Sequence, residues 1–347
     1  MKWTRVNAHI NGVIMALLPA VLFAMLMLGW SVGAFTDIEE EPYTSEEEDR
    51  IVVGVSQLGS ESRWRTANTE SVQTVFTTGN GYFLIFNNAR QKQENQIKAI
   101  RSFISQRVDY IVFSPVVETG WETVLQEAKE AGIPVILMDR KVDVQDKGLY
   151  ATCVGSDFTK EGEDAGHWLE EDLRRRGRSG ETINIVVLKG TEGSSSQIGR
   201  TVGFSSVADK HENWIIREQA YADFTSAKGK EVMESLLKKY RDIDVVVSQN
   251  DDMTFGAIEA IRESGRTVGV RGEITVISFD AAHDALKMVA DGIINVDIEC
   301  NPNQGEYISD VIGMIENGHQ VEKQYYVEEH IFTPDNVTEE VLRERNY

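Results

Sequence analysis

Short apolar runs rich in β-branched residues recur along the chain from residue 51 onward, and amphipathic stretches separate them. The runs have the length of buried strands, and the stretches between them have the period of helices that cover a sheet. The predicted strands are residues 51–55, 82–86, 110–113, 134–138, 183–188, 215–216, 245–247, 274–279 and 293–298. The clearest predicted helices are residues 91–106, 121–131, 226–240 and 253–264. This alternation predicts an α/β fold of parallel sheets with helices on both faces.

The number of predicted strands fits either one large sheet or two sheets of about five strands each. Two sheets agree better with the usual size of a domain in a chain of 347 residues. Residues 151–158 are interpreted as the passage from the first half to the second. The prediction is therefore two doubly wound parallel-sheet lobes.

The first 50 residues do not follow this alternation. Lys2 and Arg5 precede an uncharged apolar segment at 12–33, so residues 1–36 are either a signal peptide or a membrane anchor, and both remain open. Val32 and Ala34 offer a small-residue cleavage site. Residues 37–50 form an acidic linker. Either reading predicts that the body of the protein is extracytoplasmic.

The net charge of −21 excludes a nucleic-acid partner, because phosphate binding needs clustered lysine and arginine. Cys153 and Cys300 are the chain's two cysteines, too few for a disulfide-built scaffold. The sequence has no nucleophile elbow, no phosphate-cradling glycine loop and no metal-ligand histidine spacing. It therefore predicts no enzyme activity and implies no cofactor.

Polar residues follow five of the predicted strands, where ligands bind in open α/β sheets. Any one of them could be a helix cap, and Asp251-Asp252 could be a metal pair or a cap. Five such ends together favour a ligand site. Guanidinium and carboxylate groups bind adjacent hydroxyls with paired hydrogen bonds, and an indole can cover the C–H face of a sugar ring. The residues are Glu61, Ser62, Trp64, Arg65, Asp139, Arg140, Asn250, Asp280 and Glu299.

Several strings carry a resemblance to the periplasmic sugar-binding proteins of bacterial ABC importers, in the ribose and galactose group. They are SQLGSES at 56–62 with Trp64-Arg65, QKQENQIKA at 91–99, SPVV at 114–117 with TGW at 119–121, Asp139-Arg140, KGKEVME at 228–234 and NDDM at 250–253. The likeness covers about residues 51–334 and is strongest to the galactofuranose-binding members.

The resemblance implies two lobes joined by a hinge of three crossovers, near 154–157, 301–303 and 328–332. Lobe 1 would comprise 51–154 and 302–329, and lobe 2 would comprise 155–301 and 330–347. It also adds Arg200 and Asp223 to the expected ligand contacts.

The implied function is capture of a galactofuranose- or galactose-like monosaccharide between closing lobes, and its delivery to ABC permease subunits. The alternative is a ligand-presenting sensor subunit for a histidine kinase or chemoreceptor that uses the same pocket. We expect a monomer in either case.

Two departures from the family pattern suggest a shift in specificity. Arg63 stands where the family usually has glycine, and Gly199 where it tends to have aspartate. Both changes favour a more acidic ligand, such as a uronic acid or a sugar phosphate. The two cysteines would each lie beside a crossover, which raises the hypothesis of a hinge disulfide between Cys153 and Cys300.

Overall fold

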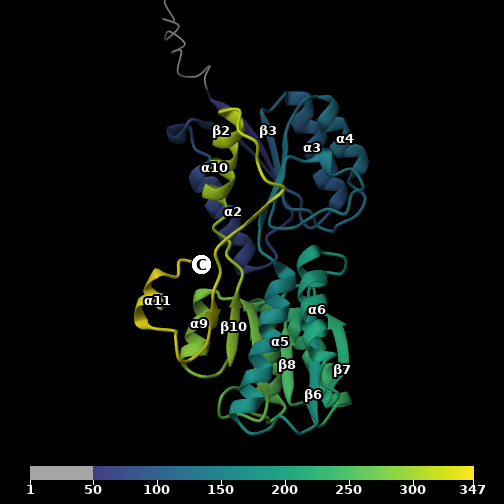
Figure 1. Cartoon of the computed structure of the whole chain (residues 1–347), viewed down its shortest axis with the longest axis vertical. Helices are drawn as coiled ribbons and strands as arrows, with labels where there is room; N and C mark the ends of the chain where they lie inside the picture. The colour runs from purple at the N-terminus through teal and green to yellow at the C-terminus, as the bar shows by residue number, and fades with distance from the viewer. Residues whose placement is uncertain (1–49) are drawn as a thin grey trace, which may run out of the picture. The chain divides into compact units, whose positions relative to one another are not determined.

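The computed structural model describes residues 50–347, which form two lobes, each built on a six-stranded sheet (Figure 1). The predicted signal peptide or anchor, and nearly all of the acidic linker, lie outside the described residues. Within residues 50–347, no helix has both the length and the apolar character needed to cross a bilayer.

The first sheet has the strand order β11-β5-β4-β3-β1-β2, and all of its pairs are parallel. Its strands are β1 (Ile51–Gln57), β2 (Tyr82–Asn88), β3 (Tyr110–Phe113), β4 (Val135–Met138), β5 (Thr152–Gly155) and β11 (Gln324–Tyr326). The helices of this lobe are α2 (Arg63–Val75), α3 (Gln93–Gln106), α4 (Glu122–Glu130) and α10 (Gly305–Glu316), with short 3₁₀ turns η1 (Thr78–Asn80) and η2 (Lys147–Leu149).

The second sheet has the order β12-β10-β9-β8-β6-β7, parallel except for the antiparallel edge pair β10–β12. Its strands are β6 (Ile183–Lys189), β7 (Trp214–Tyr221), β8 (Val245–Ser248), β9 (Thr275–Asp280), β10 (Val296–Glu299) and β12 (Ile331–Phe332). The helices are α5 (Phe158–Arg175), α6 (Ser195–Ala208), α7 (Ser226–Lys239), α8 (Asp251–Glu263), α9 (His283–Ala290) and α11 (Glu339–Glu344).

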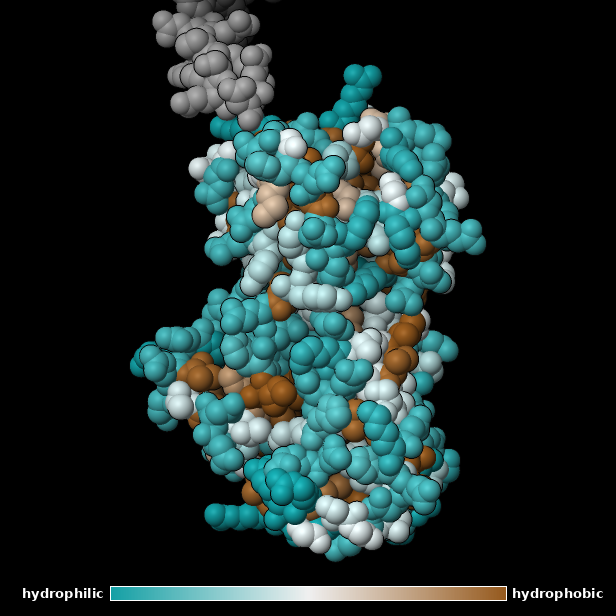
Figure 2. Space-filling model, viewed as in Figure 1, coloured by the Kyte–Doolittle hydropathy of each residue, from teal (hydrophilic) through white to brown (hydrophobic). Residues whose placement is uncertain are grey.

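Each sheet is buried on both faces, which is why its strands read as continuous apolar runs rather than as alternating ones. In β3 of the first lobe, Ile111 and Phe113 pack with α3 and α4, whereas Tyr110 and Val112 pack with α2 and α10. The second lobe repeats the plan, with α5 and α6 on one face and α7, α8 and α9 on the other. The surface is different: on the face shown in Figure 2, hydrophilic residues dominate and apolar residues form small separate areas.

The chain passes between the sheets three times, from β5 to α5, from β10 to α10 and from β11 to β12. Two doubly wound lobes joined by three crossings are the predicted fold class, which is confirmed. The stretch 151–158 contains the short strand β5 before it crosses, so it is part of the first sheet as well as a passage.

Helices α5 and α6 approach each other through glycines. A Cβ at Gly203 would collide with the backbone oxygen of Thr159 and lie 2.8 Å from the backbone nitrogen of Glu163. A Cβ at Gly199 would lie 2.6 Å from Cβ of Phe158. Gly199 is therefore a packing position, and the aspartate that the family pattern suggested has no room there without a shift of α5.

Replacing Gly203 by alanine should destabilise the protein by about 1–3 kcal/mol or more, because the obstructing atoms are backbone and cannot rotate away. Gly313 in α10 is a matched control, since its Cβ would meet nothing within 4 Å. Alanine there should stabilise by about 0.5–1 kcal/mol. Urea unfolding of both variants checks this, and equal effects at the two sites would contradict the packing argument.

Candidate ligand-binding site

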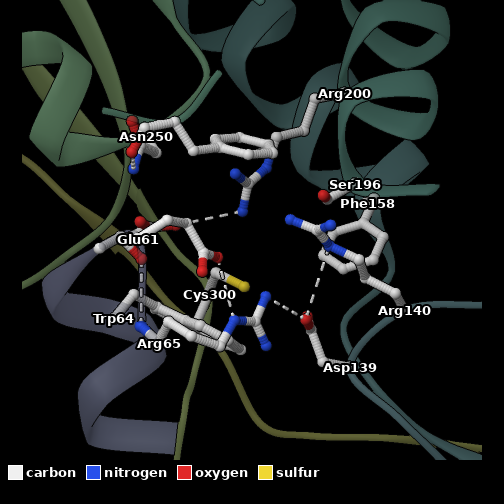
Figure 3. Close-up of a pocket in the computed structure, with 13 residues that line it drawn as sticks. Glu61, Trp64, Arg65, Asp139, Arg140, Phe158, Ser196, Arg200, Asn250 and Cys300 are labelled. Atoms are coloured by element: carbon white, nitrogen blue, oxygen red, sulfur yellow. Dashed lines mark hydrogen bonds and ion pairs between the residues drawn. The ribbon is translucent and has the colours of Figure 1, made fainter. Parts of the chain in front are cut away.

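A cavity of about 280 Å³ lies between the two lobes, at the carboxyl ends of both sheets (Figure 3). The residues that line it are Glu61, Ser62, Trp64, Arg65, Asp139, Arg140, Phe158, Ser196, Arg200, Phe224, Asn250, Asp280 and Cys300.

The first-lobe wall is built around the guanidinium of Arg65. Its Nη2 lies 2.7 Å from Oδ2 of Asp139, and its Nε lies 3.2 Å from Oε1 of Glu61. All three side chains are about 3% exposed. Ser62 begins α2 by accepting a hydrogen bond from the backbone N–H of Arg65, which fixes the helix start. Burial opposes the charge on Arg65, but the two carboxylates outweigh it and raise the pKa of the arginine.

Arg140 is the less well paired arginine of this wall. Its Nη1 donates to the carbonyl of Val116 at 3.1 Å, and its Nε is 3.9 Å from Oδ2 of Asp139. No residue of the described chain accepts a hydrogen bond from that Nε. Burial, together with the charge of Arg65, lowers the pKa of Arg140 to about 10. A buried donor without a partner needs an explanation, and on a residue that lines the cavity a ligand atom would supply one.

Arg200 of α6 holds the second-lobe wall together. Its Nε donates to Oε2 of Glu161 at 2.6 Å, and its Nη2 donates to Oδ1 of Asp280 at 3.3 Å. Its Nη1 donates to the carbonyl of Gln249. Burial opposes the charge, but Glu161 and Asp280 raise the pKa of the arginine, so it stays ionised. The residue before Arg200 is Gly199, where the family tends to have aspartate. Glu161 of α5 supplies a carboxylate to Arg200 instead.

Asp280 occupies an unusual backbone position, with φ of 109° at the end of β9. Two buried carboxyls behind it hold the turn that follows. Oδ1 of Asp297 accepts from the N–H of Ala281 at 3.1 Å, and Oδ2 of Asp251 accepts from the N–H of Ala282 at 2.8 Å. Burial raises the pKa of Asp251 well above its usual range and that of Asp297 to about 7. The pair therefore fixes the strained turn that presents Asp280 to the cavity.

From the raised pKa values of Asp251 and Asp297 we predict that the free energy of unfolding falls as the pH rises. The folded pKa of Asp297 is about 7, while an unfolded aspartate titrates near ~3.9. Between these values the folded state binds more protons, so the group's contribution is complete below pH ~4 and is lost towards pH ~7. Urea unfolding from pH 4.5 to 8 should show that the free energy of unfolding falls as the pH rises. Asp297→Asn should make this fall less steep, by about 1.4 kcal/mol per pH unit between the two pKa values. Asp335→Asn, at an exposed position, should leave the slope unchanged.

Aromatic rings form the apolar part of the cavity wall. Trp64 is 4% exposed and packs with Phe158 and Cys300, and its indole N–H donates to the backbone carbonyl of Cys300. The ring of Phe224 lies 5.4 Å from the guanidinium carbon of Arg140, so it covers an arginine of the opposite lobe. Apolar rings beside paired charged groups match the two kinds of surface that a sugar ring presents.

A family model described as "Periplasmic binding protein domain" matches residues 53–317. The chain belongs to the periplasmic binding protein family. Galactofuranose-binding protein YtfQ of Escherichia coli (strain K12) is 42% identical over 301 residues, which cover 85% of this chain and 92% of that protein. Fructose import binding protein FruE of Bifidobacterium longum is 29% identical, over 83% of this chain and 86% of its own length.

Solved structures of similar proteins agree with this assignment. A protein from Mycobacterium smegmatis in complex with β-D-fucofuranose is 43% identical, with a TM-score of 0.80, covering 86% of this chain and 95% of that chain. The periplasmic component of an arabinose ABC transporter from Shewanella sp. ANA-3, bound to α- and β-L-arabinofuranose, is 40% identical, with a TM-score of 0.79 and coverage of 85% and 95%.

These findings confirm the resemblance and the extracytoplasmic solute-binding role. Its close relatives are binding proteins rather than enzymes, and this periplasmic binding protein is likewise not an enzyme. Membership of the family implies a location outside the cytoplasm. The relatives do not favour the sensor alternative.

The structure brings most of the predicted ligand contacts of this binding protein together around the cavity. They are Glu61, Ser62, Trp64, Arg65, Asp139, Arg140, Arg200, Asn250 and Asp280. Asn250 also caps α8, because its Oδ1 accepts from the N–H of Met253, so it has a structural role in addition.

Two predicted contacts, Asp223 and Glu299, do not line the cavity. Asp223 is exposed, and the next residue, Phe224, turns inward instead. The carboxylate of Glu299 is occupied by the C-terminal segment: Oε1 accepts from Arg345 at 2.5 Å and Oε2 from the N–H of His330 at 2.8 Å. Its position at the end of β10 thus anchors His330 of the last crossing and the C-terminal segment.

Four cavity residues were not predicted from the sequence: Phe158, Ser196, Phe224 and Cys300. Phe224 and Cys300 directly follow the predicted contacts Asp223 and Glu299 in the sequence, so the strand-end rule missed them by one residue. Phe158 and Ser196 lie in the first turns of α5 and α6, and an inspection of predicted strand ends could not find them.

The hypothesis of a hinge disulfide is wrong, and Arg63 lies outside the residues that line the cavity. Arg63 does not enter the cavity: its side chain is 54% exposed, pairs with Asp284 of α9 and lies over the ring of Phe255. It bridges the two lobes at the rim. Cys153 and Cys300 are both free, because Cys153 packs in the core of the first lobe and Cys300 lies at the cavity.

Proposed function

We propose that this periplasmic binding protein captures a neutral monosaccharide in the furanose form, galactofuranose or a close relative, and delivers it to the permease of an ABC importer. The observation that carries the proposal is the pair of open hydrogen-bonding atoms in the cavity wall. Within residues 50–347, Nε of Arg140 lacks an acceptor and Oε2 of Glu61 lacks a donor, and both are buried. A hydroxyl group can satisfy either one, since it donates and accepts.

The charges of the cavity wall support a neutral ligand rather than an acid. Arg65 and Arg200 are each paired with two carboxylates, so little positive charge is left over. Arg63, the cation that suggested an acidic ligand, lies outside the cavity. The furanose form is supported by two relatives at 40% identity or more whose structures hold furanose sugars.

Ring-locked ligands test the ring form directly. 1,4-Anhydro-D-galactitol is a fixed five-membered ring, and 1,5-anhydro-D-galactitol is its fixed six-membered counterpart. By calorimetric titration, we expect the first to bind and the second to bind at least ~100-fold more weakly. Free galactose should bind with an apparent dissociation constant raised by the reciprocal of its minor furanose fraction. Tighter binding of the six-membered ring would overturn the furanose proposal, and tighter binding of galacturonate would overturn the neutral one.

The relatives support delivery to a permease rather than to a sensor. They are named as sugar-binding or import binding proteins, and this chain matches them over nearly their whole length. We infer that the protein acts as a monomer. We also propose the lobe limits 51–154 with 302–329 and 155–301 with 330–347, and export directed by residues 1–36, retained as an anchor or cleaved. Deleting the gene should abolish uptake of the labelled sugar at low concentration. Normal uptake, combined with loss of sugar-induced transcription, would favour the sensor.

A further inference from the structure

A second cavity, of about 570 Å³, lies at the hinge beside the ligand cavity. Glu161 and Glu329 line this second cavity, whereas Cys300 lines the first. These three side chains thus separate the two spaces. Asp157, Asp164 and His330 also line the second cavity, together with Lys160, which pairs with Asp164.

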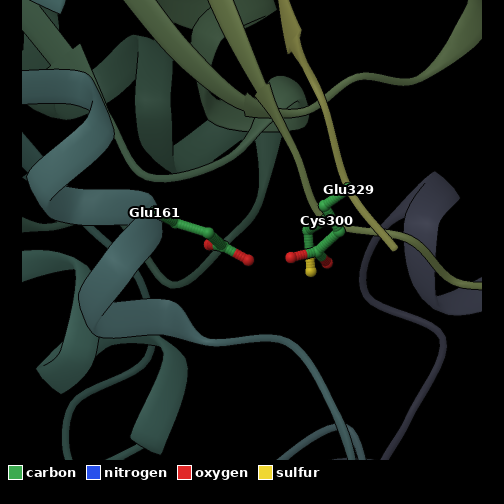
Figure 4. Close-up of side chains that lie close together, drawn as sticks. All are labelled: Glu161, Cys300 and Glu329. Atoms are coloured by element: carbon green, nitrogen blue, oxygen red, sulfur yellow. The ribbon is translucent and has the colours of Figure 1, made fainter. Parts of the chain in front are cut away.

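The three side chains converge from separate parts of the chain (Figure 4). Glu161 lies in the first turn of α5, just after the first crossing, Cys300 begins the second crossing, and Glu329 lies in the third. One ligand atom from each, two carboxylate oxygens and the sulfur, lie within 4.8 Å of one another. The cluster therefore joins all three crossings between the lobes.

Glu161 has an open oxygen at this cluster. The residue is 3% exposed, and its Oε2 pairs with Arg200, but its Oε1 has no hydrogen-bond partner in the described part of the chain. Figure 4 shows the carboxylate pointing toward Cys300 and Glu329. A buried carboxylate oxygen without a donor is costly unless a cation or a proton satisfies it.

We propose that Glu161, Cys300 and Glu329 bind a divalent transition-metal ion, with zinc preferred over calcium and magnesium. A thiolate with two carboxylates suits zinc, whereas calcium and magnesium favour sites made only of oxygen. On binding, the thiol proton and any proton held by the buried carboxyl groups pass to solvent. Three anionic ligands then face one divalent ion, and the guanidinium of Arg200, which also pairs with Asp280, lies beside them. Tetrahedral coordination places ligand atoms about 3.5 Å apart, so the glutamate side chains must close in by about 1 Å.

The site would link the metal to ligand capture. Glu161 holds Arg200, which lines the ligand cavity, and the three ligands come from or adjoin the segments that must bend when the lobes move. A bound ion would stiffen this hinge and change the affinity for the sugar, a coupling that acts equally in both directions.

Cobalt(II) is the probe for the test, because a thiolate ligand gives it a near-ultraviolet charge-transfer band. The full chain, without sugar, should bind one cobalt ion with that band, and zinc should displace it while calcium in excess should not. Cys300→Ser should abolish the band, and Glu329→Gln should weaken binding by on the order of 10–100-fold or more. Cys153→Ser is the matched control, because it removes the other buried cysteine, and it should keep both band and affinity.

Absence of cobalt and zinc binding by equilibrium dialysis would overturn the proposal. So would binding that survives in both Cys300→Ser and Glu329→Gln, since the ion would then sit elsewhere. Circular dichroism and urea unfolding establish that each variant is folded, and Glu329→Gln gives a second variant if Cys300→Ser fails to fold. Because no sugar is present, the result stands apart from the test of sugar binding.

Discussion

Replacing Arg140 by methionine should abolish most of the sugar affinity while lowering the stability of the unliganded protein only modestly. Hydrogen bonds to a charged group contribute about 1.5–3 kcal/mol each. The loss of one or two such hydrogen bonds to the ligand, about 2–4 kcal/mol in total, corresponds to a dissociation constant raised roughly 30- to 1,000-fold. The free energy of unfolding should fall by no more than about 1–3 kcal/mol, because the carbonyl of Val116 loses its donor. No close ion pair is lost, since the nearest carboxylate oxygen is 3.9 Å from Nε, and burial lowers the pKa of Arg140 to about 10. Methionine keeps an unbranched apolar side chain at the position but removes the guanidinium that lies over Phe224.

Calorimetric titration with the ligand and urea unfolding without it separate the two effects. Arg241→Met, at an exposed position in the second lobe, is the control and should change neither quantity. Unchanged sugar affinity in Arg140→Met would show that the open Nε does not face the ligand. A large loss of stability would show instead that the arginine is structural.

The alternation of apolar runs was sufficient to predict both sheets, because parallel strands buried on two faces leave a strong signal. It did not find β5, β11 or β12, which are two to four residues long. Other four-residue strands, such as β3 (YIVF) and β4 (VILM), were found because they are wholly apolar, whereas β5 (TCVG), β11 (QYY) and β12 (IF) lack such a run and depend on a neighbouring strand. Their pairing is a tertiary effect, and a local pattern cannot record it.

The ligand cavity was predictable to the extent that it depends on strand ends. Asp139 and Asp280 directly follow or end apolar strands, and the parallel arrangement brings such ends to the cavity edge. Glu299 satisfies the same rule but binds Arg345, a residue distant in the sequence. The direction of the Arg63 side chain likewise depends on Asp284, an acid of the other lobe. Contacts between lobes decide which strand-end residues serve the ligand, and one strand's sequence does not contain them.

Replacing Arg65 by methionine should cost about 3–5 kcal/mol of unfolding free energy, because it leaves two buried carboxylates, Glu61 and Asp139, without their counter-charge. The same substitution at Arg101 is the matched control. Arg101 also forms a two-pronged pair, with both bonds to Glu127 at 2.8 Å, but its side chain is 51% exposed. An exposed pair of this kind contributes less than about 1 kcal/mol.

Urea unfolding at neutral pH measures both variants, and the comparison contrasts a buried arginine between two carboxylates with an exposed arginine paired to one. Arg65→Met should also lose sugar binding, because Glu61 and Asp139 need the guanidinium to hold their positions at the cavity. Restoring charge balance should recover stability in part: adding Asp139→Asn to Arg65→Met removes one unpaired carboxylate and should regain about 1–3 kcal/mol. If the two single arginine variants cost the same, the buried network would not stabilise the first lobe, and its retention would then be explained by ligand binding alone.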